Sequence, residues 1–272
     1  MSEVMKVKAT DNLENDIQNI VESLGGWGKF VSQGERVFIK PNFNTADDPP
    51  ASTDMNFLKA FVNLLEKQRP GEIMVGESCT YFHCTEEVMT MKKARELEEE
   101  TSAKVLNLDE EPWEKKKVSQ GKYLKGVKVP EILKEVDRIM FLSCLKTHIY
   151  AEYTGALKLS VGLMHSDQRI PLHLRRLQEK IAELNLLFNP DLVLMDARKC
   201  FINKGPAEGE IEEPGLVLGS PSRVEIDKQG VNILNRFERS SLKGKNPEDI
   251  LQIRRAIELG VDSKKIEGEN SF

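Results

Sequence analysis

Residues 137–145, DRIMFLSCL, form the most hydrophobic run of the chain. An apolar run of this length without alternation is typical of a strand that is covered on both faces, as in the middle of a parallel sheet. Residues 191–196, DLVLMD, have the same character. We therefore expect two buried strands and helices on both sides of them.

On either side of these two runs, strand and helix patterns alternate along the chain. Strands are predicted at 36–40, 72–75 and 104–108, and residues 216–226 indicate a strand or hairpin. Helical spacing of apolar residues is found at 16–24, 54–67, 85–100, 154–164, 172–188 and 247–259. This alternation is typical of an α/β fold with a mostly parallel sheet and helices on both faces.

One segment interrupts the alternation. Residues 110–126 are rich in Lys and Glu, which favours a hairpin-like excursion at the surface. No internal repeat or low-complexity linker divides the chain. We therefore expect a single α/β domain over residues 1–272, with one insertion within 110–130.

The composition excludes several classes of protein. The 272 residues include 39 Lys and Arg against 44 Asp and Glu, a net charge of −5, which argues against disorder and against a nucleic-acid binder. No apolar run reaches the roughly 18 residues that a membrane-spanning helix needs. The first residues lack the pattern of a signal peptide, and the four cysteines are scattered. We expect reduced thiols, a cytoplasmic location and no membrane partner.

Polar side chains follow the predicted strands, where ligands bind in parallel sheets. An ammonium group at this edge could hold a carboxylate or a phosphate, although ordinary surface charge is the alternative. We therefore expect a site for a small anionic ligand. Its candidate residues are Lys40, Asn42, Glu77, Ser78, Lys146 and Thr147.

A Cys-x3-His spacing occurs twice, at Cys79/His83 and Cys144/His148. A thiolate and an imidazole from each loop would suit a tetrahedral zinc site, whereas a Cys144 buried in its strand is the plainer alternative. Further candidate ligands for a transition metal are Cys84, His165 and His173. Without a CxxC pair, no iron–sulfur cluster is expected within this chain.

Three residues are candidates for catalysis. His83 and His148 follow predicted strands, and facing imidazoles could exchange protons with a substrate, although packed or surface histidines are the alternative. A desolvated Lys158 could anchor a ligand or act as a nucleophile. The nucleotide motifs GxxxxGK[ST] and GxGxxG and the hydrolase motif GxSxG are absent.

Several short motifs in order resemble domain-of-unknown-function family 362. They lie at 39–42, 76–78, 145–148 and 154–158, and residues 203–209 and 249–260 are similar to the family's later segments. The resemblance implies no established activity. Many family members carry a ferredoxin module that this chain lacks, so a separate ferredoxin-type partner is one expectation.

Residues 148–158 also look like the histidine–glycine–lysine segment of nickel-pincer lactate racemases. This resemblance implies that Lys158 carries a nickel nucleotide cofactor and that His83 and His148 are the acid/base pair. His165 or His173 would be a further nickel ligand. The racemases' Thr-Arg-Pro substrate segment has no arginine counterpart in residues 44–52, so Lys40 is the candidate partner for a carboxylate.

Three hypotheses follow for the function. The first is an enzyme with racemase- or epimerase-like proton or hydride chemistry on a small anionic substrate. The second is a metal- or cofactor-binding accessory protein that partners a separate iron–sulfur protein. The third is a structural remnant that kept the fold and lost the activity.

Overall fold

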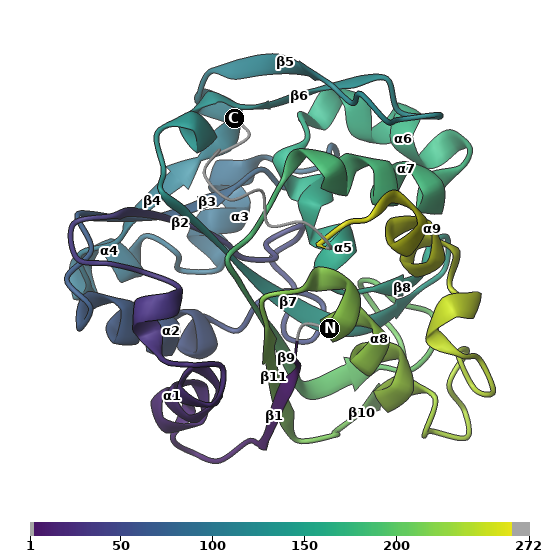
Figure 1. The fold of residues 1–272 in the computed structure, drawn as a ribbon, viewed down its shortest axis with the longest axis horizontal. Helices are drawn as coiled ribbons and strands as arrows, with labels where there is room; N and C mark the ends of the chain where they lie inside the picture. Colours follow the sequence, from purple (N-terminus) through teal and green to yellow (C-terminus); the bar gives the residue numbers. More distant parts are fainter. Residues whose placement is uncertain (1–2, 263–272) are drawn as a thin grey trace.

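The main sheet of the protein is mostly parallel, as the sequence predicts. A computed structural model describes residues 3–262. Within this range the strand order is β1-β11-β9-β7-β2-β3-β4, with β8 beside β7 and β10 beside β9 (Figure 1). The parallel strands are β2 (Arg36–Lys40), β3 (Glu72–Glu77), β4 (Lys104–Asn107), β7 (Arg138–His148) and β9 (Leu192–Phe201). The antiparallel strands are β1 (Met5–Lys8), β8 (Glu152–Thr154), β10 (Ile211–Glu212) and β11 (Leu216–Ser220).

Strand β7 is the centre of this sheet, because it pairs in parallel with both β2 and β9. It contains the hydrophobic run that predicted a buried strand and extends it to His148. Phe141 and Leu145 pack into one core, and Met140 and Leu142 pack into the other. Successive side chains of the strand thus pack alternately into two hydrophobic cores, one on each face of the sheet.

Helices cover both faces of the sheet, as expected (Figure 1). One face is covered by α1 (Leu13–Ser23), α2 (Met55–Glu66), α3 (Thr85–Met91) and α4 (Glu96–Glu100). The other is covered by α5 (Ala156–Leu159), α6 (Arg169–Leu174), α7 (Leu177–Leu184), α8 (Arg223–Leu234) and α9 (Leu251–Leu259). Short 3₁₀ turns are η1 (Trp27–Lys29), η2 (Leu108–Glu110), η3 (Glu131–Lys134), η4 (Ser160–Leu163), η5 (Ser166–Gln168), η6 (Asn185–Leu187) and η7 (Pro247–Asp249).

The predicted excursion is an antiparallel hairpin of β5 (Trp113–Lys117) and β6 (Gly126–Pro130). It is more than a surface feature. Val118, Val127 and Val129 are buried in the core that covers the α5–α9 face of the sheet. The Trp113 indole N–H also donates a 2.8 Å hydrogen bond to the carbonyl of Leu108. The hairpin is therefore part of the domain's hydrophobic core.

Two predicted helices are each broken in the structure. The segment 85–100 forms α3 and α4, and Lys93 between them has a φ of 58°. The segment 172–188 overlaps α6 and α7, and Arg176 between these two has a φ of 57°. A left-handed residue cannot continue an α-helix, and apolar spacing does not reveal it. The prediction of one continuous helix in each segment was therefore wrong.

Two further segments differ from the sequence prediction. Residues 154–164 begin in β8 and continue as the short helix α5 and the turn η4, instead of one helix. Residues 216–226 contain strand β11 and then the first residues of helix α8, which the sequence did not predict. Eight of the twelve residues of α8 are buried, so its apolar residues do not form a single stripe. No helix in residues 3–262 is long and apolar enough to cross a membrane.

Candidate functional site

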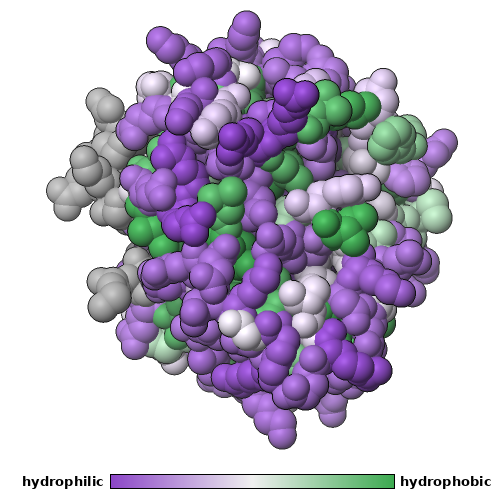
Figure 2. Space-filling view, turned by 90° about the vertical axis from the view of Figure 1, so that its right-hand side faces the viewer, coloured by the Kyte–Doolittle hydropathy of each residue, from purple (hydrophilic) through white to green (hydrophobic). Residues whose placement is uncertain are grey.

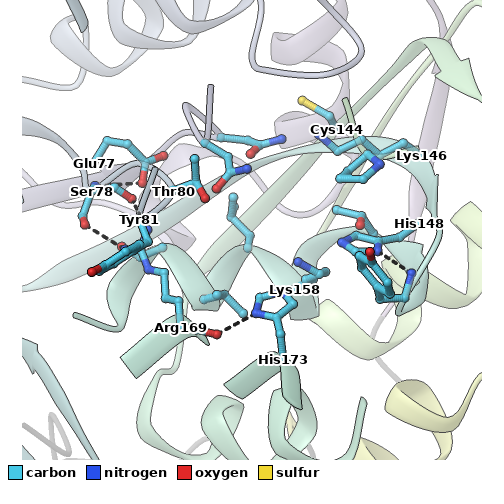
Figure 3. Close-up of a pocket in the computed structure, with 18 of the residues that line it drawn as sticks. Glu77, Ser78, Thr80, Tyr81, Cys144, Lys146, His148, Lys158, Arg169 and His173 are labelled. Atoms are coloured by element: carbon cyan, nitrogen blue, oxygen red, sulfur yellow. Dashed lines mark hydrogen bonds between the residues drawn. The ribbon is translucent and has the colours of Figure 1, made fainter. Parts of the chain in front are cut away.

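A pocket of about 470 Å³ opens at the carboxyl ends of β2, β3 and β7 (Figure 3). The structure brings most of the predicted site residues to this pocket. Those that line it are Lys40, Asn42, Glu77, Ser78, Cys144, Lys146, His148, Lys158 and His173. Thr147 is buried but does not line the pocket, because it alternates with Lys146 and His148 along β7. Its hydroxyl has no partner among the described residues.

A buried ion pair forms one part of the pocket wall. Lys40 Nζ lies 2.6 Å from Glu77 Oε1, and both side chains are almost fully buried. Burial lowers the pKa of Lys40, and the Glu77 charge opposes this shift. Lys40 Nζ also donates to the carbonyl of Pro41 at 2.7 Å. Lys40 is thus already paired, in contrast to the expectation that it holds a ligand's carboxylate.

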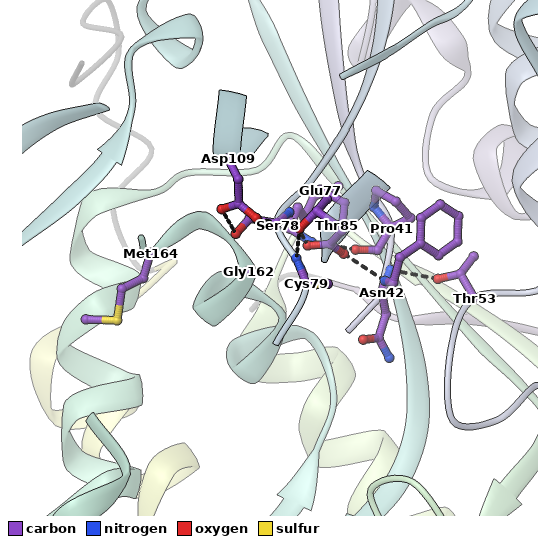
Figure 4. A network of polar contacts seen from close by, with 12 residues as sticks. Pro41, Asn42, Thr53, Glu77, Ser78, Cys79, Thr85, Asp109, Gly162 and Met164 are labelled. Carbon is purple, nitrogen blue, oxygen red and sulfur yellow. Dashed lines mark hydrogen bonds and ion pairs between the residues drawn. The ribbon is translucent and has the colours of Figure 1, made fainter. Parts of the chain in front are cut away.

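The loops after β2 and β3 are held by a network of polar contacts around this pair (Figure 4). The Phe43 amide donates to Glu77 Oε2 at 2.7 Å, and the Ser78 amide donates to Glu77 Oε1 at 2.9 Å. Gly162 of η4 packs directly on the pair, since a Cβ there would lie 2.6 Å from Lys40 Nζ. The wall is therefore closely packed at this point.

Lys146 and Lys158 are the cations that remain for a ligand. Lys146 is buried, and its ammonium donates to the carbonyl of Ala51. Lys158 lies on α5 at the pocket wall, and no residue in 3–262 accepts a hydrogen bond from its Nζ. Desolvation, with the charges of Lys146 and Arg169, lowers the pKa of Lys158 to about 8. We call the lysines Lys146 and Lys158, with the neighbouring Arg169, the positive cluster of the pocket. Its positive charge lies in a partly desolvated pocket, which favours an anionic ligand.

Arg169 is a site residue that sequence reasoning missed. All five of its N–H donors are used, on the carbonyls of Met164, Ser78, Cys79 and Gly162 and on the Ser78 hydroxyl. The guanidinium therefore joins α6 to the loop after β3. It adds charge to the pocket, but it has no donor left for a ligand. No local motif in the sequence signals such a long-range contact.

His148 presents a hydrogen-bond donor to the pocket. Its Nδ1 accepts from the backbone amides of Tyr150 at 3.0 Å and Ala151 at 3.2 Å. This network assigns the proton of the neutral ring to Nε2. Burial, with the nearby charge of Lys158, lowers the pKa of His148 to about 2. His148 therefore stays neutral at physiological pH.

His173 has the opposite arrangement. Its Nδ1 lies 2.7 Å from the carbonyl oxygen of Arg169, which can only accept a hydrogen bond. Nδ1 thus carries the proton, and Nε2 keeps its lone pair. Burial lowers the pKa of His173, which favours this neutral form. Both rings line the same pocket, with Lys158 between them in the view of Figure 3.

Helix α5, which carries Lys158, is held in place by a buried aspartate on α8. Asp227 accepts from the amides of Ala156 at 2.6 Å and Leu157 at 2.9 Å. The Tyr153 hydroxyl donates to the same carboxylate at 3.3 Å. Burial raises the pKa of Asp227 to about 7. Sequence reasoning missed Asp227 because it missed helix α8.

The expected pairing of His83 with His148 is not seen. His83 is exposed and does not line the pocket, so the structure does not place it opposite His148. The pocket brings His173 to His148 instead. His165 lies away from the pocket, with its Nδ1 2.8 Å from Asp167 and its ring against Trp113.

The cysteines do not gather with the histidines. Cys79 and Cys144 are buried, Cys84 is exposed, and burial raises the pKa of the first two thiols. The Cys79 thiol donates to the carbonyl of His83 at 3.1 Å. Within the described range, no three His, Cys, Asp or Glu side chains are placed to hold a metal ion. The predicted Cys79/His83/Cys144/His148 zinc site is therefore not assembled.

The fold and the pocket define an α/β protein with a cationic ligand site at the carboxyl edge of a parallel sheet. The chain belongs to the family described as domain of unknown function (DUF362), whose model matches residues 37–232. The resemblance that the sequence motifs indicated is thereby confirmed.

Comparison with curated and solved proteins finds distantly similar proteins. The chain is 24% identical over 219 residues to a thylakoid-associated protein of Synechocystis sp., covering 78% of this chain and 66% of that protein. A crystal structure from Thermotoga maritima matches with a TM-score of 0.47 and 11% identity, covering 85% of this chain and 59% of the other. The lactate racemase apoprotein of Thermoanaerobacterium thermosaccharolyticum matches with a TM-score of 0.45 and 14% identity, covering 80% and 54%. The chain thus spans less than two thirds of each of these proteins.

The pocket's residues fit an anchored cofactor of the kind that the sequence resemblance implies. Lys158 offers an amine without an acceptor among the described residues, and His173 offers the Nε2 lone pair. In that case Lys158 would hold the nickel nucleotide and His173 would ligate the metal, and neither group would then be free for a substrate anion or a proton. When bound, such a group would supply a centre for hydride chemistry.

Proposed function

We propose that the protein is an enzyme that binds an anionic substrate in this pocket and moves a proton to and from it. The opposite hydrogen-bonding roles of the two histidines carry this proposal. His148 offers Nε2–H as a donor, and His173 offers Nε2 as an acceptor. A donor and an acceptor that line one pocket are what a proton-transfer reaction at carbon requires.

The positive cluster accounts for binding. The Lys158 ammonium has no acceptor among the described residues, so a ligand's carboxylate or phosphate would supply one. The charge of Lys146 adds to the attraction. The interaction is strong because the cluster lies in a partly dry pocket, where charges are weakly screened. The bound anion would also raise the pKa of Lys158 and keep it charged.

The histidines account for the chemistry. His173 Nε2 removes a proton from the carbon next to the substrate's carboxylate or carbonyl group, and the C–H electron pair moves into an enolate. His148 Nε2–H donates a hydrogen bond to the enolate oxygen, since a ring with a pKa of about 2 does not take up a proton at neutral pH. Return of the proton to the carbon completes the cycle. Racemisation or epimerisation results when the enolate reorients before His173 returns the proton, so that the proton reaches the opposite face.

Exchange of substrate hydrogen with D₂O tests the proposal. Wild-type protein is incubated with a panel of 2-hydroxy and 2-oxo acids, and loss of the carbon-bound proton signal is followed by NMR. We expect exchange with at least one acid and a fall of roughly 100-fold or more in His173→Gln, because the base is removed. Exchange at the wild-type rate in His173→Gln would contradict the assigned base.

His83→Gln separates this mechanism from the one expected from the sequence. We expect this variant to exchange at the wild-type rate, since His83 lies outside the pocket. A loss of exchange in His83→Gln with retention in His173→Gln would favour the His83/His148 pair instead. Circular dichroism of both variants checks that the fold is kept.

Other expectations from the sequence stay predictions. These are the cytoplasmic location, the single domain over the whole chain, the ferredoxin-type partner and the absence of nucleic-acid and membrane partners. No contact among residues 3–262 favours the accessory-protein hypothesis over the enzyme.

A further inference from the structure

Exposed apolar side chains line the mouth of the cationic pocket. Five of them line it and are also exposed, from 40% for Ile170 to 79% for Phe82. We call these five the apolar collar: Tyr81, Phe82, Tyr150, Ile170 and Leu174.

The collar is a concentration of exposed apolar surface rather than a random scatter. Nine large apolar side chains are exposed within residues 3–262, and five of them belong to the collar. They come from three separate segments, namely the loop after β3, the turn after β7 and helix α6. Single exposed apolar residues are ordinary, but a group that surrounds one cavity marks a binding surface.

The collar has a defined local structure. The Tyr81 and Phe82 rings contact each other edge to face, with centroids 5.6 Å apart. Ile170 and Leu174 are four residues apart and lie on one face of α6. Both parts are therefore attached to elements that also hold the pocket, because Arg169 at the start of α6 bonds to the loop after β3.

The volume of the pocket exceeds the need of a small acid. A pocket of about 470 Å³ lies in the range that accommodates drug-sized ligands. An acid of about six non-hydrogen atoms would leave most of this space to water, whose share of liquid volume is about 30 Å³ per molecule. The cations lie inside and the apolar groups lie at the mouth, so the pocket has two chemically different ends.

We propose that the ligand is an amphipathic anion, a soluble molecule with a carboxylate at one end and an aromatic or branched apolar body at the other. The carboxylate lies near Lys146 and Lys158, and the apolar body contacts the collar. This inference rests on the proposed function in that it names its class of substrate. The charge of the pocket interior favours this occupant over an uncharged apolar peptide or a second copy of the chain.

A matched set of three probes tests the two ends separately. 2-Naphthoate carries both features, acetate carries only the anion, and 2-naphthamide carries only the aromatic body. Naphthalene fluorescence measures the affinity of the aromatic probes, and acetate is measured by competition. We expect 2-naphthoate to bind roughly 10- to 100-fold more tightly than acetate, from burial of about 100 Å² of apolar surface. 2-Naphthamide should bind at least tenfold more weakly than 2-naphthoate.

Substitutions in the collar identify where the aromatic body lies. Leu174→Ser and Phe82→Ser should each weaken 2-naphthoate severalfold and leave acetate unchanged. Met91→Ser is the matched control, because Met91 is 72% exposed but does not line the pocket, and it should change neither affinity. Equal affinities for acetate and 2-naphthoate, or no effect of the two collar variants, would overturn the proposal.

Two further measurements exclude other occupants. Sedimentation velocity compares wild type with Leu174→Ser, and a dimer that this variant abolishes would assign the collar to a protein interface instead. Co-sedimentation with phosphatidylglycerol vesicles that depends on Phe82, without binding of 2-naphthoate, would assign it to a membrane surface. Either result overturns the proposal.

The test separates this inference from the proton-transfer mechanism. His173→Gln should lower hydrogen exchange by roughly 100-fold or more while 2-naphthoate still binds, because the base is not part of the collar. Collar-dependent binding of 2-naphthoate without exchange in any acid would leave the amphipathic ligand standing and overturn the chemistry. Exchange confined to small acids, with no effect of the collar variants on binding, would leave the proton-transfer mechanism standing and overturn the amphipathic ligand.

Discussion

At the residue scale, the chemistry of this pocket depends on which nitrogen of each histidine is already bonded to the backbone. Residue type alone indicated that His148 could exchange protons near neutral pH. In the structure two backbone amides donate to Nδ1, so the ring proton lies on Nε2 and can be donated. Burial and nearby positive charges keep the ring neutral. His173, with its Nδ1 on a carbonyl, became the acceptor. The sequence shows that both histidines are present, but it does not show which backbone groups their ring nitrogens contact.

The state of His148 can be measured directly. We expect its ring to show the Nε2–H tautomer in ¹⁵N NMR and no titration between pH 4 and pH 8, because its pKa lies near 2. The signals are assigned by their loss in His148→Gln. An Nδ1–H tautomer, or a titration near the ordinary histidine pKa of about 6.5, would disprove the assignment.

At the element scale, sequence patterns predicted the strands better than the helices. The strand at 36–40 was predicted at its observed bounds, and the run at 137–145 lies within β7. Strands in the middle of a sheet are set by apolar composition alone, which is local information. The breaks at Lys93 and Arg176 and the buried helix α8 depend on tertiary contacts, which the spacing of apolar residues does not contain.

The short helix α5 depends on Asp227 of α8, and this dependence is sensitive to pH. The pKa of Asp227 is raised in the fold from 3.8 to about 7, so the folded state binds this proton more tightly than the unfolded state. The free energy of unfolding that this group contributes is full below pH 4 and is lost as the pH rises through about 7. The slope is at most about 1.4 kcal/mol per pH unit.

Asp227→Asn should remove this slope. Urea unfolding of wild type and variant at pH 5, 6 and 7 gives the difference in unfolding free energy at each pH. We expect the variant to be less stable at every pH, since it loses an acceptor for the α5 amides, and the difference to shrink as the pH rises. A difference that stays constant with pH would refute the raised pKa.

At the scale of the whole molecule, the order of strands places the site. The strand pattern predicted that polar residues after several strands meet at one edge, and the structure brings Lys40, Glu77, Lys146 and His148 to one pocket. Helical residues complete it, with Lys158 from α5 and His173 from α6. Arg169 and Asp227 could not be predicted, because their partners are distant in the sequence and no motif marks them.

The hairpin β5–β6 contributes to the stability of the whole domain rather than only to its surface. Val127 is fully buried in the core beneath this hairpin. We expect Val127→Ala to lower the free energy of unfolding by about 2 kcal/mol, from two lost methyl groups and the cavity that they leave. Lys115→Ala on the same hairpin is the control, since Lys115 is exposed and should change stability little. Equal stabilities of the two variants in urea would show that the hairpin packs loosely.

The hydrogen bonds from α5 to Asp227 also have a consequence for synthesis on the ribosome. Lys40 emerges early, but the residue that fixes the helix carrying Lys158 is made almost two hundred residues later. At about 5–20 residues per second, a nascent chain would wait roughly ten seconds or more between the two. During that interval the strands can associate while the pocket is incomplete, so the ligand cannot assist the early steps of folding. The ligand can bind, and so stabilise, only the completed chain.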